Sequence, residues 1–424
     1  MRVCFLSRRF FPAISGMSVY ALNLVRELAR CGHDVTMISQ YRGDAAGKGV
    51  YGGGPPPDVP GVHVIGLESL GEQVVGGGAP ADWEADIETM VEAVAWCHDE
   101  QPLDVIHAQY AYPTGLAALE AARRLRVPCV VSVQGGDGHW IGPCCDTHAA
   151  AMKAVLNHAG AVLIGSKSFR DETCDNNGVD PARFTIVPGA TDTARFAPRP
   201  GLEGNLGELR DPPRLLYHGR VDLRKGLGEL IAALPQILEA VPHAALTVSG
   251  IGPDTDAVRA RAAELGLEDK VTLAGYASYE EAPDRLRGGD VFVSPTYSEG
   301  FSNTILEAMA SGLPVVSTET VGVVDCLTHG DNGLLVPVGA VDELAAAVVR
   351  VLKDADLRRR LAARGLEDAR TLYSWRAVGA QIQDVYERLR GTTPDPSWTE
   401  IYDPRRTVAD ADPTCRFRPA PHLL

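Results

Sequence analysis

Short apolar runs alternate with amphipathic stretches along most of the chain. In the first half, runs rich in β-branched residues predict short buried strands at Val3–Leu6, Val35–Ile38, Val62–Ile65, Val105–His107, Cys129–Val133 and Val162–Ile164. Apolar positions at helical spacing predict helices between them, at Val19–Arg30, Trp83–His98, Gly115–Arg126 and Ala149–His158. Alternation of this kind favours a parallel sheet with helices on both faces.

The second half repeats the pattern. Its predicted strands are Leu215–His218, Ala245–Ser249, Val271–Ala274, Val291–Ser294, Val315–Ser317 and Leu334–Val336. Its predicted helices are Leu227–Glu239, Ala257–Leu265, Tyr279–Leu286 and Asn303–Ser311. We therefore predict an α/β protein with two Rossmann-like domains.

The segment from Phe196 to Pro213 is rich in Pro and Gly and shows no periodicity, which is typical of a domain boundary. We place an N-terminal domain at residues 1–198 and a C-terminal domain at 199–375. Residues 392–424 are polar, contain Pro and lack a pattern, so we expect a loosely ordered tail.

Size and charge exclude several classes of protein. A chain of 424 residues is too long for one ordinary core and suggests two domains. Its net charge of −15 argues against nucleic acid as a main partner. No apolar run approaches the roughly 20 residues that span a bilayer, and no basic amphipathic helix supports peripheral membrane contact. In the N-terminus the basic residues follow the apolar run, the wrong order for a signal peptide, so we expect a cytoplasmic protein.

The nine cysteines form no C-x-x-C pair and no zinc spacing. We therefore expect reduced thiols and no metal site.

The segment from Ser294 to Val316 carries the strongest chemical signal. It runs from an apolar strand through a Gly-containing turn into a helix that begins near Asn303, with Glu299 in the turn and Glu307 inside the helix. Open α/β sheets bind ligands at the carboxyl ends of their strands, and a helix N-terminus suits phosphate. Two acids beside such a phosphate site can bind the hydroxyls of a sugar nucleotide; the alternative is that they only cap a helix.

This string resembles the E-x7-E signature of family 4 glycosyltransferases, which are retaining enzymes of the GT-B fold. The resemblance extends from Met1 to about Arg390. It implies two Rossmann-like domains that face each other across a cleft. It also implies that the helix at 376–391, which follows Tyr373-Ser-Trp375, crosses back to the N-terminal domain.

Two cations lie near the start of the second half, in the segment Gly219-Arg-Val-Asp-Leu-Arg-Lys-Gly226. Arg220 and Lys225 lie between a strand and a helix, where they can neutralise a pyrophosphate; the alternative is a pair of solvated surface charges. The segment resembles the family's G-R-x-x-x-x-K-G element, which implies that both bind the donor diphosphate. With these cations present, no bound metal is required. Asp254 and Asp256 fit a D-x-D metal motif, but we interpret them as residues that cap a helix.

The resemblance implies a larger donor set. Gly16 belongs to a loop similar to the family's P-x-x-G-G loop, Gly250 and Gly252 to a close-approach loop, and Tyr276 to a segment that meets the base. The donor-binding residues implied in this way are Gly16, Arg220, Lys225, Gly250, Gly252, Tyr276, Glu299, Gly300, Phe301, Ser302, Asn303, Thr304 and Glu307.

The first half is expected to hold the acceptor. His107, Gln134, Asp137 and His139 lie at predicted strand ends. Many relatives carry a histidine at the position of Gln134; an amide cannot act as a general base but can bind a sugar hydroxyl. For His107, a hydrogen-bonded core histidine is an equally good interpretation.

We predict a retaining glycosyltransferase that moves a hexose-type sugar from a nucleoside-diphosphate sugar to a hydroxyl acceptor, with Glu299, Arg220 and Lys225 as catalytic residues. The nucleotide sugar is a co-substrate, and no cofactor is expected. The reaction proceeds by front-face displacement or by double displacement through Glu299. Two alternatives stay open: a sugar-nucleotide 2-epimerase-like enzyme of the same fold, and a non-catalytic sugar-nucleotide-binding protein.

Overall fold

The computed structural model describes residues 1–11, 15–41, 55–68, 83–202, 204–403 and 415. The chain divides into two compact units. The first unit comprises Met1–Pro188 together with Gly379–Leu424, and the second comprises Gly189–Val378. Each unit is built on one parallel sheet, as the alternation of strands and helices predicts.

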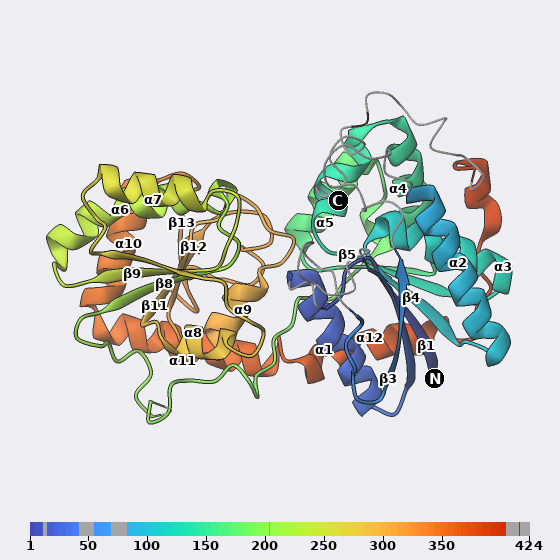
Figure 1. The fold of residues 1–424 in the computed structure, drawn as a ribbon, viewed down its shortest axis with the longest axis horizontal. Coiled ribbons are helices and arrows are strands. Elements are labelled where there is room, and N and C mark those ends of the chain that lie inside the picture. The colour runs from blue at the N-terminus through green and yellow to red at the C-terminus, as the bar shows by residue number, and fades with distance from the viewer. Residues whose placement is uncertain (12–14, 42–54, 69–82, 203, 404–414, 416–424) are drawn as a thin grey trace. The chain divides into compact units, whose positions relative to one another are not determined.

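The first unit contains a seven-stranded sheet in the order β3-β2-β1-β4-β5-β6-β7 (Figure 1). Its strands are β1 (Arg2–Ser7), β2 (Asp34–Tyr41), β3 (Val62–Glu68), β4 (Val105–Gln109), β5 (Cys129–Val133), β6 (Ala161–Ile164) and β7 (Phe184–Ile186). All of its strand pairs are parallel.

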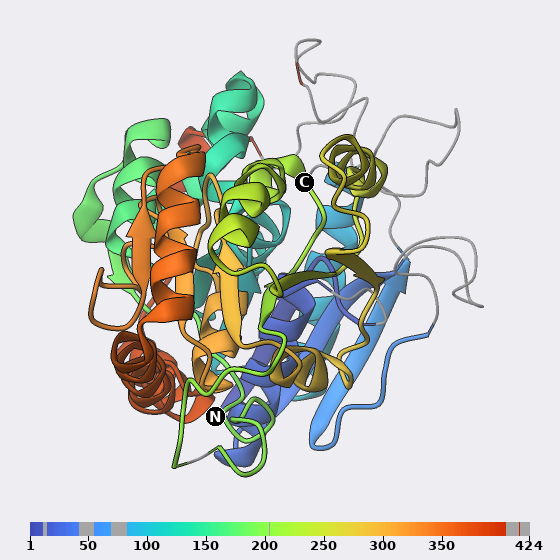
Figure 2. The same ribbon diagram turned by 90° about the vertical axis from the view of Figure 1, so that its left-hand side faces the viewer.

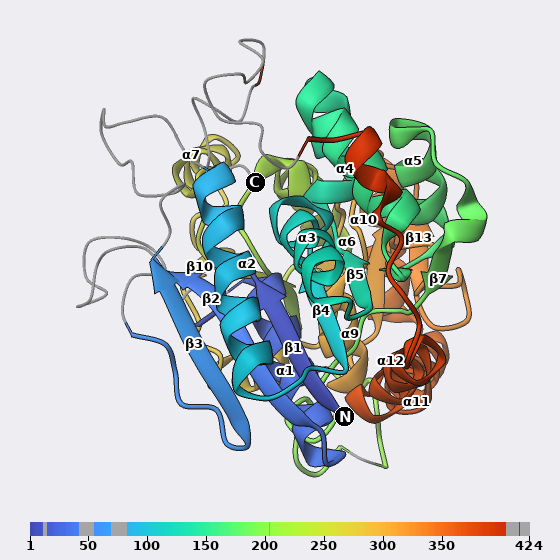
Figure 3. The same ribbon diagram turned by 90° about the vertical axis from the view of Figure 1, so that its right-hand side faces the viewer.

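The main helices of the first unit are α1 (Gly16–Arg30), α2 (Trp83–Glu100), α3 (Leu116–Leu125), α4 (Asp146–His158) and α5 (Lys167–Asn177). Figure 3 shows α2 and α3 in front of the strands. α12 (Trp375–Leu389) packs beside α1, since a Cβ on Gly379 would lie 2.7 Å from Cγ of Glu27 and His33 Nε2 lies 2.9 Å from Gln383 Oε1.

The second unit contains a six-stranded parallel sheet in the order β10-β9-β8-β11-β12-β13. Its strands are β8 (Arg214–His218), β9 (Ala245–Ser249), β10 (Val271–Gly275), β11 (Val291–Ser294), β12 (Val315–Thr318) and β13 (Leu334–Val336). Its helices are α6 (Leu227–Ala240), α7 (Thr255–Glu264), α8 (Ala282–Arg287), α9 (Asn303–Ala310), α10 (Val341–Lys353) and α11 (Ala355–Thr371). Figures 1 and 2 show helices on both faces of this sheet.

In β8, β11, β12 and β13, alternate residues enter different cores, because side chains of a strand point to opposite faces in turn. In β11, Val291 and Val293 pack in the core formed with α6, α7 and α10. Phe292 packs in the opposite core, formed with α8 and α9. Both faces of the sheet are therefore buried, which explains why its strands are continuous apolar runs.

The division between the units lies at Pro188 and Gly189, ten residues before the predicted boundary at 198. The reason is packing within the second unit. Phe196 is 3% exposed in a core of that unit, and the Thr191 N–H donates to Tyr373 O at 2.8 Å. At the other end, α12 begins in the second unit, and its residues from Gly379 onward belong to the first.

Part of the predicted loose tail is folded. Residues Pro396–Glu400 form a 3₁₀ turn that contacts α4. Trp398 is fully buried there, and Tyr402 is 3% exposed. Burial of these two aromatic side chains holds the segment against the protein, although most of its residues are polar. Within the described part of the chain, every helix is too short or too polar to cross a membrane.

Candidate active site

The site in the second unit lies where the order of its strands reverses. β8 lies between β9 and β11, so the connections from its end and from the end of β11 leave in opposite directions. In an open α/β sheet, the crevice at the carboxyl ends of two such strands is the usual ligand site. The loop after β8 carries Arg220 and Lys225, and the loop after β11 carries Glu299.

The loop after β8 is held by its own side chains. The Tyr217 hydroxyl donates to Arg220 O at 2.7 Å, and Asp222 caps the short turn Leu223–Lys225. Arg224 donates from its guanidinium to both oxygens of Asp222, and this contact lowers the pKa of Asp222 to about 2. Arg224 is therefore occupied by the loop itself. Arg220 is 59% exposed, with Nε 3.6 Å from Asp222 Oδ2, so its guanidinium remains accessible to a ligand.

Lys225 and Glu299 form an ion pair across the two loops. Lys225 Nζ lies 2.8 Å from Glu299 Oε1, and both side chains are partly buried. Lys225 Nζ also lies 3.4 Å from Ser298 O, to which it donates. The backbone joins the same loops, because the Tyr297 N–H donates to Arg224 O at 3.1 Å. The structure thus brings together two of the three predicted catalytic residues.

Helix α9 begins directly after this loop. Ser302 is its N-cap residue, but its hydroxyl makes no capping bond to the helix among the described residues and lies 3.4 Å from the Thr304 hydroxyl. The first-turn N–H groups, including those of Asn303 and Thr304, are therefore available to an anion. Phe301 packs on Tyr373 with ring centroids 5.7 Å apart, so Phe301 and Gly300 offer backbone rather than side-chain contacts to this site.

Glu307 lies one turn inside α9 and is 9% exposed. Burial raises its pKa to about 8, while the charge of Arg195 acts in the opposite direction. A buried carboxyl of this kind is stabilised when the hydroxyls of a ligand form hydrogen bonds with it. Arg195 also lies over the Tyr279 ring at 3.6 Å and donates to Tyr279 O at 2.6 Å. Sequence reasoning missed Arg195, because nothing in its local sequence connects it to a helix more than a hundred residues away.

Glycines allow the loops of the site to approach each other. A Cβ on Gly250 would lie 1.8 Å from Gly219 O, and one on Gly252 would lie 2.0 Å from Val221 O. These two residues therefore allow the loop after β9 to pack closely against the loop after β8.

Tyr276 follows β10 and is 48% exposed, so its side chain is accessible to a ligand. Asp254 is the N-cap residue of α7 and Asp256 lies in its first turn, as predicted, but the Asp254 carboxylate accepts from the Leu223 N–H at 2.7 Å and so stabilises the loop after β8.

In the first unit, the corresponding reversal lies at β1 and β4. Gln109, at the end of β4, accepts from the Ser7 hydroxyl at 2.7 Å and donates to Met17 O at 2.9 Å. It also donates to Gln134 Oε1 at 2.7 Å. Gln134 is thus held by its oxygen in a network of amides at the carboxyl edge of the sheet.

Two predicted acceptor residues are used by the protein itself. His107 is fully buried, with Nδ1 2.6 Å from the Tyr386 hydroxyl and Nε2 2.7 Å from the Ser132 hydroxyl. Burial lowers its pKa to about 3, so it is a neutral core residue. Asp137 is also fully buried and accepts from the N–H groups of Ala111 at 2.8 Å and Gly135 at 2.9 Å. The geometry gives these two side chains a structural role instead of the predicted contact with an acceptor.

His139 has a largely buried side chain, which is 7% exposed. Its Nδ1 lies 2.6 Å from Glu172 Oε1, and its ring packs against Phe169 at 4.6 Å between centroids.

Gly16 is the first residue of α1, after Ser15. Ser15 and Ser18 form a reciprocal capping box there, with Ser15 N donating to Ser18 Oγ at 2.7 Å. Residues 12–14, which belong to the loop that resembles the family's P-x-x-G-G loop, lie outside the described residues.

Comparison with known proteins supports the same interpretation. A family model described as "Glycosyl transferases group 1" matches residues 202–368, and one described as "Glycosyl transferase 4-like domain" matches residues 15–190. The GDP-mannose-dependent alpha-(1-6)-phosphatidylinositol monomannoside mannosyltransferase of Mycolicibacterium smegmatis is 30% identical over 318 residues, covering 72% of this chain and 78% of that protein. The chain belongs to the group 1 glycosyltransferases of family 4.

Two further proteins resemble this glycosyltransferase over most of its length. The D-inositol 3-phosphate glycosyltransferase of Kineococcus radiotolerans is 28% identical over 408 residues, covering 88% of this chain and 90% of that protein. The sucrose-phosphate synthase of Thermosynechococcus elongatus superposes with a TM-score of 0.76 at 24% identity, covering 92% of this chain and 98% of that one. The fold is therefore GT-B, as the resemblance implies.

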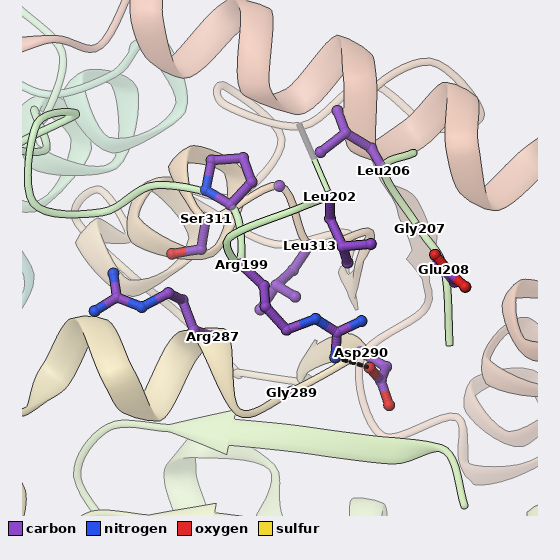
Figure 4. A pocket seen from close by; sticks show the side chains of 12 residues that line it. Arg199, Leu202, Leu206, Gly207, Glu208, Arg287, Gly289, Asp290, Ser311 and Leu313 are labelled. Carbon is purple, nitrogen blue, oxygen red and sulfur yellow. Dashed lines mark ion pairs between the residues drawn. The ribbon is translucent and has the colours of Figure 1, made fainter. Parts of the chain in front are cut away.

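A separate hollow in the second unit of the glycosyltransferase lies at the opposite edge of its sheet (Figure 4). Gly289 and Asp290 line it immediately before β11, whereas the candidate site described above follows the end of that strand. Asp290 is 4% exposed and is paired with Arg210 at 2.6 Å and with Arg199 at 3.8 Å. Its charge is therefore already balanced. The two ion pairs of Asp290 hold the segment before β8 in place, and the hollow is distinct from the candidate site described above.

Proposed function

We propose that the protein is a retaining glycosyltransferase that moves a hexose-type sugar from a nucleoside-diphosphate sugar to a hydroxyl acceptor. The observation that carries the proposal is the grouping of Lys225, Glu299 and the first turn of α9 at the strand reversal of the second unit. Fixed positive charge, an acid and free N–H groups in one place match the diphosphate and the sugar of an activated donor.

Each group has a role in this proposal. Arg220 and Lys225 neutralise the diphosphate, with the α9 N–H groups assisting. The buried Glu307 accepts hydrogen bonds from the ribose hydroxyls. Glu299 and the backbone from Gly300 to Asn303 hold the transferred sugar. Gly250, Gly252 and Tyr276 border the nucleotide, and Gly16 completes the donor contacts.

The bond between the anomeric carbon and the diphosphate oxygen breaks, and its electron pair leaves with the diphosphate. The acceptor oxygen forms the new bond on the same face of the sugar, and its proton passes to the departing phosphate oxygen. Arg220 and Lys225 stabilise the negative charge that accumulates on the leaving group. Double displacement through Glu299 is the competing route, and it requires a covalent glycosyl–Glu299 intermediate.

Gln134 and His139 are the proposed acceptor contacts. The Gln134 oxygen accepts from Gln109 and its side chain also hydrogen-bonds Tyr20, so one amide N–H is the group that we propose meets a sugar or acceptor oxygen.

A thermal-shift screen with GDP-mannose, UDP-glucose, ADP-glucose and dTDP-glucose tests donor binding. GDP-mannose comes first, because the mannosyltransferase relative is named as GDP-mannose-dependent. A donor present at a hundred times its Kd stabilises the protein by about 2.7 kcal/mol. Absence of any shift with all four donors, together with absence of turnover, contradicts the proposal.

Proton NMR of the reaction then separates the possible functions. A retaining transferase gives a product whose anomeric configuration equals that of the donor, and it forms only when an acceptor is present. An epimerised nucleotide sugar in a mixture without acceptor identifies a 2-epimerase. Saturable binding without product across an acceptor panel identifies a binding protein.

A further inference from the structure

Three cysteines and one histidine of the first unit meet at the start of α4. Cys144 and Cys145 precede the helix, His148 lies in its first turn, and Cys415 comes from the C-terminal segment. The three sulfur atoms and one imidazole nitrogen all lie within 4.8 Å of one another. None of these residues belongs to the site described above, and no other group of this kind occurs among the described residues.

Three of the six distances between these atoms are close to those of ligands around one small cation. Cys144 Sγ lies 3.8 Å from Cys415 Sγ, which itself lies 3.8 Å from His148 Nδ1. Cys145 Sγ lies 3.3 Å from the same Nδ1 atom. A tetrahedral zinc ion with Zn–S near 2.3 Å and Zn–N near 2.0 Å places its ligands about 3.8 Å apart for two sulfurs and about 3.5 Å apart for sulfur and nitrogen.

The surroundings orient these ligands. His148 is 3% exposed and Cys415 is 6% exposed, while Cys144 and Cys145 are partly buried. The Tyr112 ring packs edge-on against the His148 ring at 4.8 Å, which fixes the plane of the imidazole. Cys145 is the N-cap residue of α4, so its position is fixed by the start of that helix.

We propose that Cys144, Cys145, His148 and Cys415 bind one structural zinc ion. Three thiolates and one imidazole fill a four-coordinate shell, the composition typical of structural zinc, and leave no position for a substrate. Each thiol releases its proton to solvent as it binds the metal, and His148 binds in its neutral form through Nδ1. No oxidation step is involved.

The sequence did not reveal this site, since Cys415 lies 271 residues from Cys144 and no C-x-x-C pair is present. The expectation of no metal site rested on that spacing. Zinc binding here would tie Cys415 to α4, next to the buried turn that contains Trp398. It would therefore stabilise the first unit by joining its C-terminal segment to its body.

The test uses the full chain, purified under reducing conditions and dialysed against zinc-free buffer. We expect about one zinc per chain by inductively coupled plasma mass spectrometry. Cobalt exchange is expected to give the intense visible d–d bands of a tetrahedral site, with thiolate charge-transfer bands in the near ultraviolet. Cys415→Ser and His148→Ala are each expected to retain less than about a tenth of the wild-type zinc after dialysis against a chelator, because four ligands close the site. The control Cys31→Ser, which changes an exposed cysteine outside the cluster, is expected to retain wild-type zinc.

Two results would overturn the proposal. One is wild-type chain that holds no zinc after reconstitution and gives the weak cobalt spectrum of an octahedral aqua ion. The other is a disulfide between Cys144 and Cys415, detected by non-reducing peptide mass spectrometry of a second preparation that is purified without reductant. The wild-type measurements need no variant, so they decide the question even where a variant fails to fold.

Discussion

Lys225 Nζ lies 2.8 Å from Glu299 Oε1, and this ion pair joins the two loops that leave the strand reversal of the second unit. Neither residue is deeply buried, so the pair itself adds little to stability. Its importance is positional. It holds a cation where a donor diphosphate is proposed to bind, and it holds an acid where the transferred sugar is proposed to lie.

Lys225→Ala is therefore expected to reduce turnover by about 10²- to 10³-fold, since it removes one preorganised charge from the leaving group. Initial rates with the donor found in the thermal-shift screen give the measurement. Lys270→Ala removes an exposed lysine that contacts Pro242 O on the protein surface, and it is expected to keep the wild-type rate. Equal rates for wild type and Lys225→Ala would show that the assigned role is wrong.

Glu307 is expected to make stability depend on pH. Its carboxyl pKa is ordinarily 4.5 and is raised to about 8 in the folded protein by burial. The folded protein therefore holds this proton more tightly than the unfolded chain does. The contribution is fully present below about pH 4.5 and is lost as the pH rises toward 8, with a total on the order of 3–5 kcal/mol.

Glu307→Gln removes this titration. The variant is expected to lose less stability than wild type between pH 5 and pH 9, measured by urea denaturation without ligand at each pH. Glu239→Gln, on an exposed position of α6, serves as the control and is expected to follow the wild-type curve. Parallel curves for Glu307→Gln and wild type would contradict the raised pKa.

Gly226→Ala is expected to disrupt the loop after β8, where we propose that the donor diphosphate binds. Gly226 has φ of +74°, and an added Cβ would lie 1.8 Å from Pro295 O, so the loop after β8 must move away from the loop after β11. Gly266→Ala has a similar φ of +67° but meets nothing within 4 Å, so it isolates the backbone strain of about 1–2 kcal/mol. We expect donor affinity by calorimetry to fall sharply for Gly226→Ala and to stay unchanged for Gly266→Ala. Equal affinity in both variants would show that the close approach is unimportant.

Trp398→Ala is expected to destabilise the first unit by about 3–5 kcal/mol, because it empties a fully buried aromatic position against α4. Trp96→Ala, at a position that is 55% exposed, removes a side chain of the same kind with little loss of packing. Urea denaturation followed by circular dichroism compares the two. Similar midpoints would mean that the segment after α12 contributes nothing to the fold.

Much of the fold was predictable from apolar runs and periodicity, although the amphipathic helices α10 and α11 were not among the predicted helices. β5, β9, β11 and β13 have the predicted bounds, because each is a short apolar run buried on both faces. α5 was missed because its sequence, KSFRDETCDNN, buries few side chains and lacks an apolar stripe. β7 was missed because it has only three residues. Neither element carries a periodic signal long enough to detect.

The grouping of the candidate residues in the second unit was predictable because they are close in sequence. Glu299 and Glu307 belong to one strand–turn–helix segment, and Arg220 and Lys225 belong to one loop. In the first unit, the prediction of site residues relied on residue type, which was a poor guide. His107 resembles a catalytic group in the sequence, and only its bonds to Tyr386 and Ser132 show that it is a core residue. Such long-range pairing cannot be deduced from local pattern.

The passage of α12 from one unit to the other at Gly379 determines how the molecule can be divided. A recombinant fragment of residues 189–378 is one continuous stretch that contains the complete six-stranded sheet, so it is the natural piece for expression and ligand titration by itself. A fragment that stops at Pro188 would leave His107 without the Tyr386 hydroxyl and Glu27 without its neighbour Gly379. The N-terminal unit can be isolated intact only when the two separated stretches are joined by a linker or supplied together.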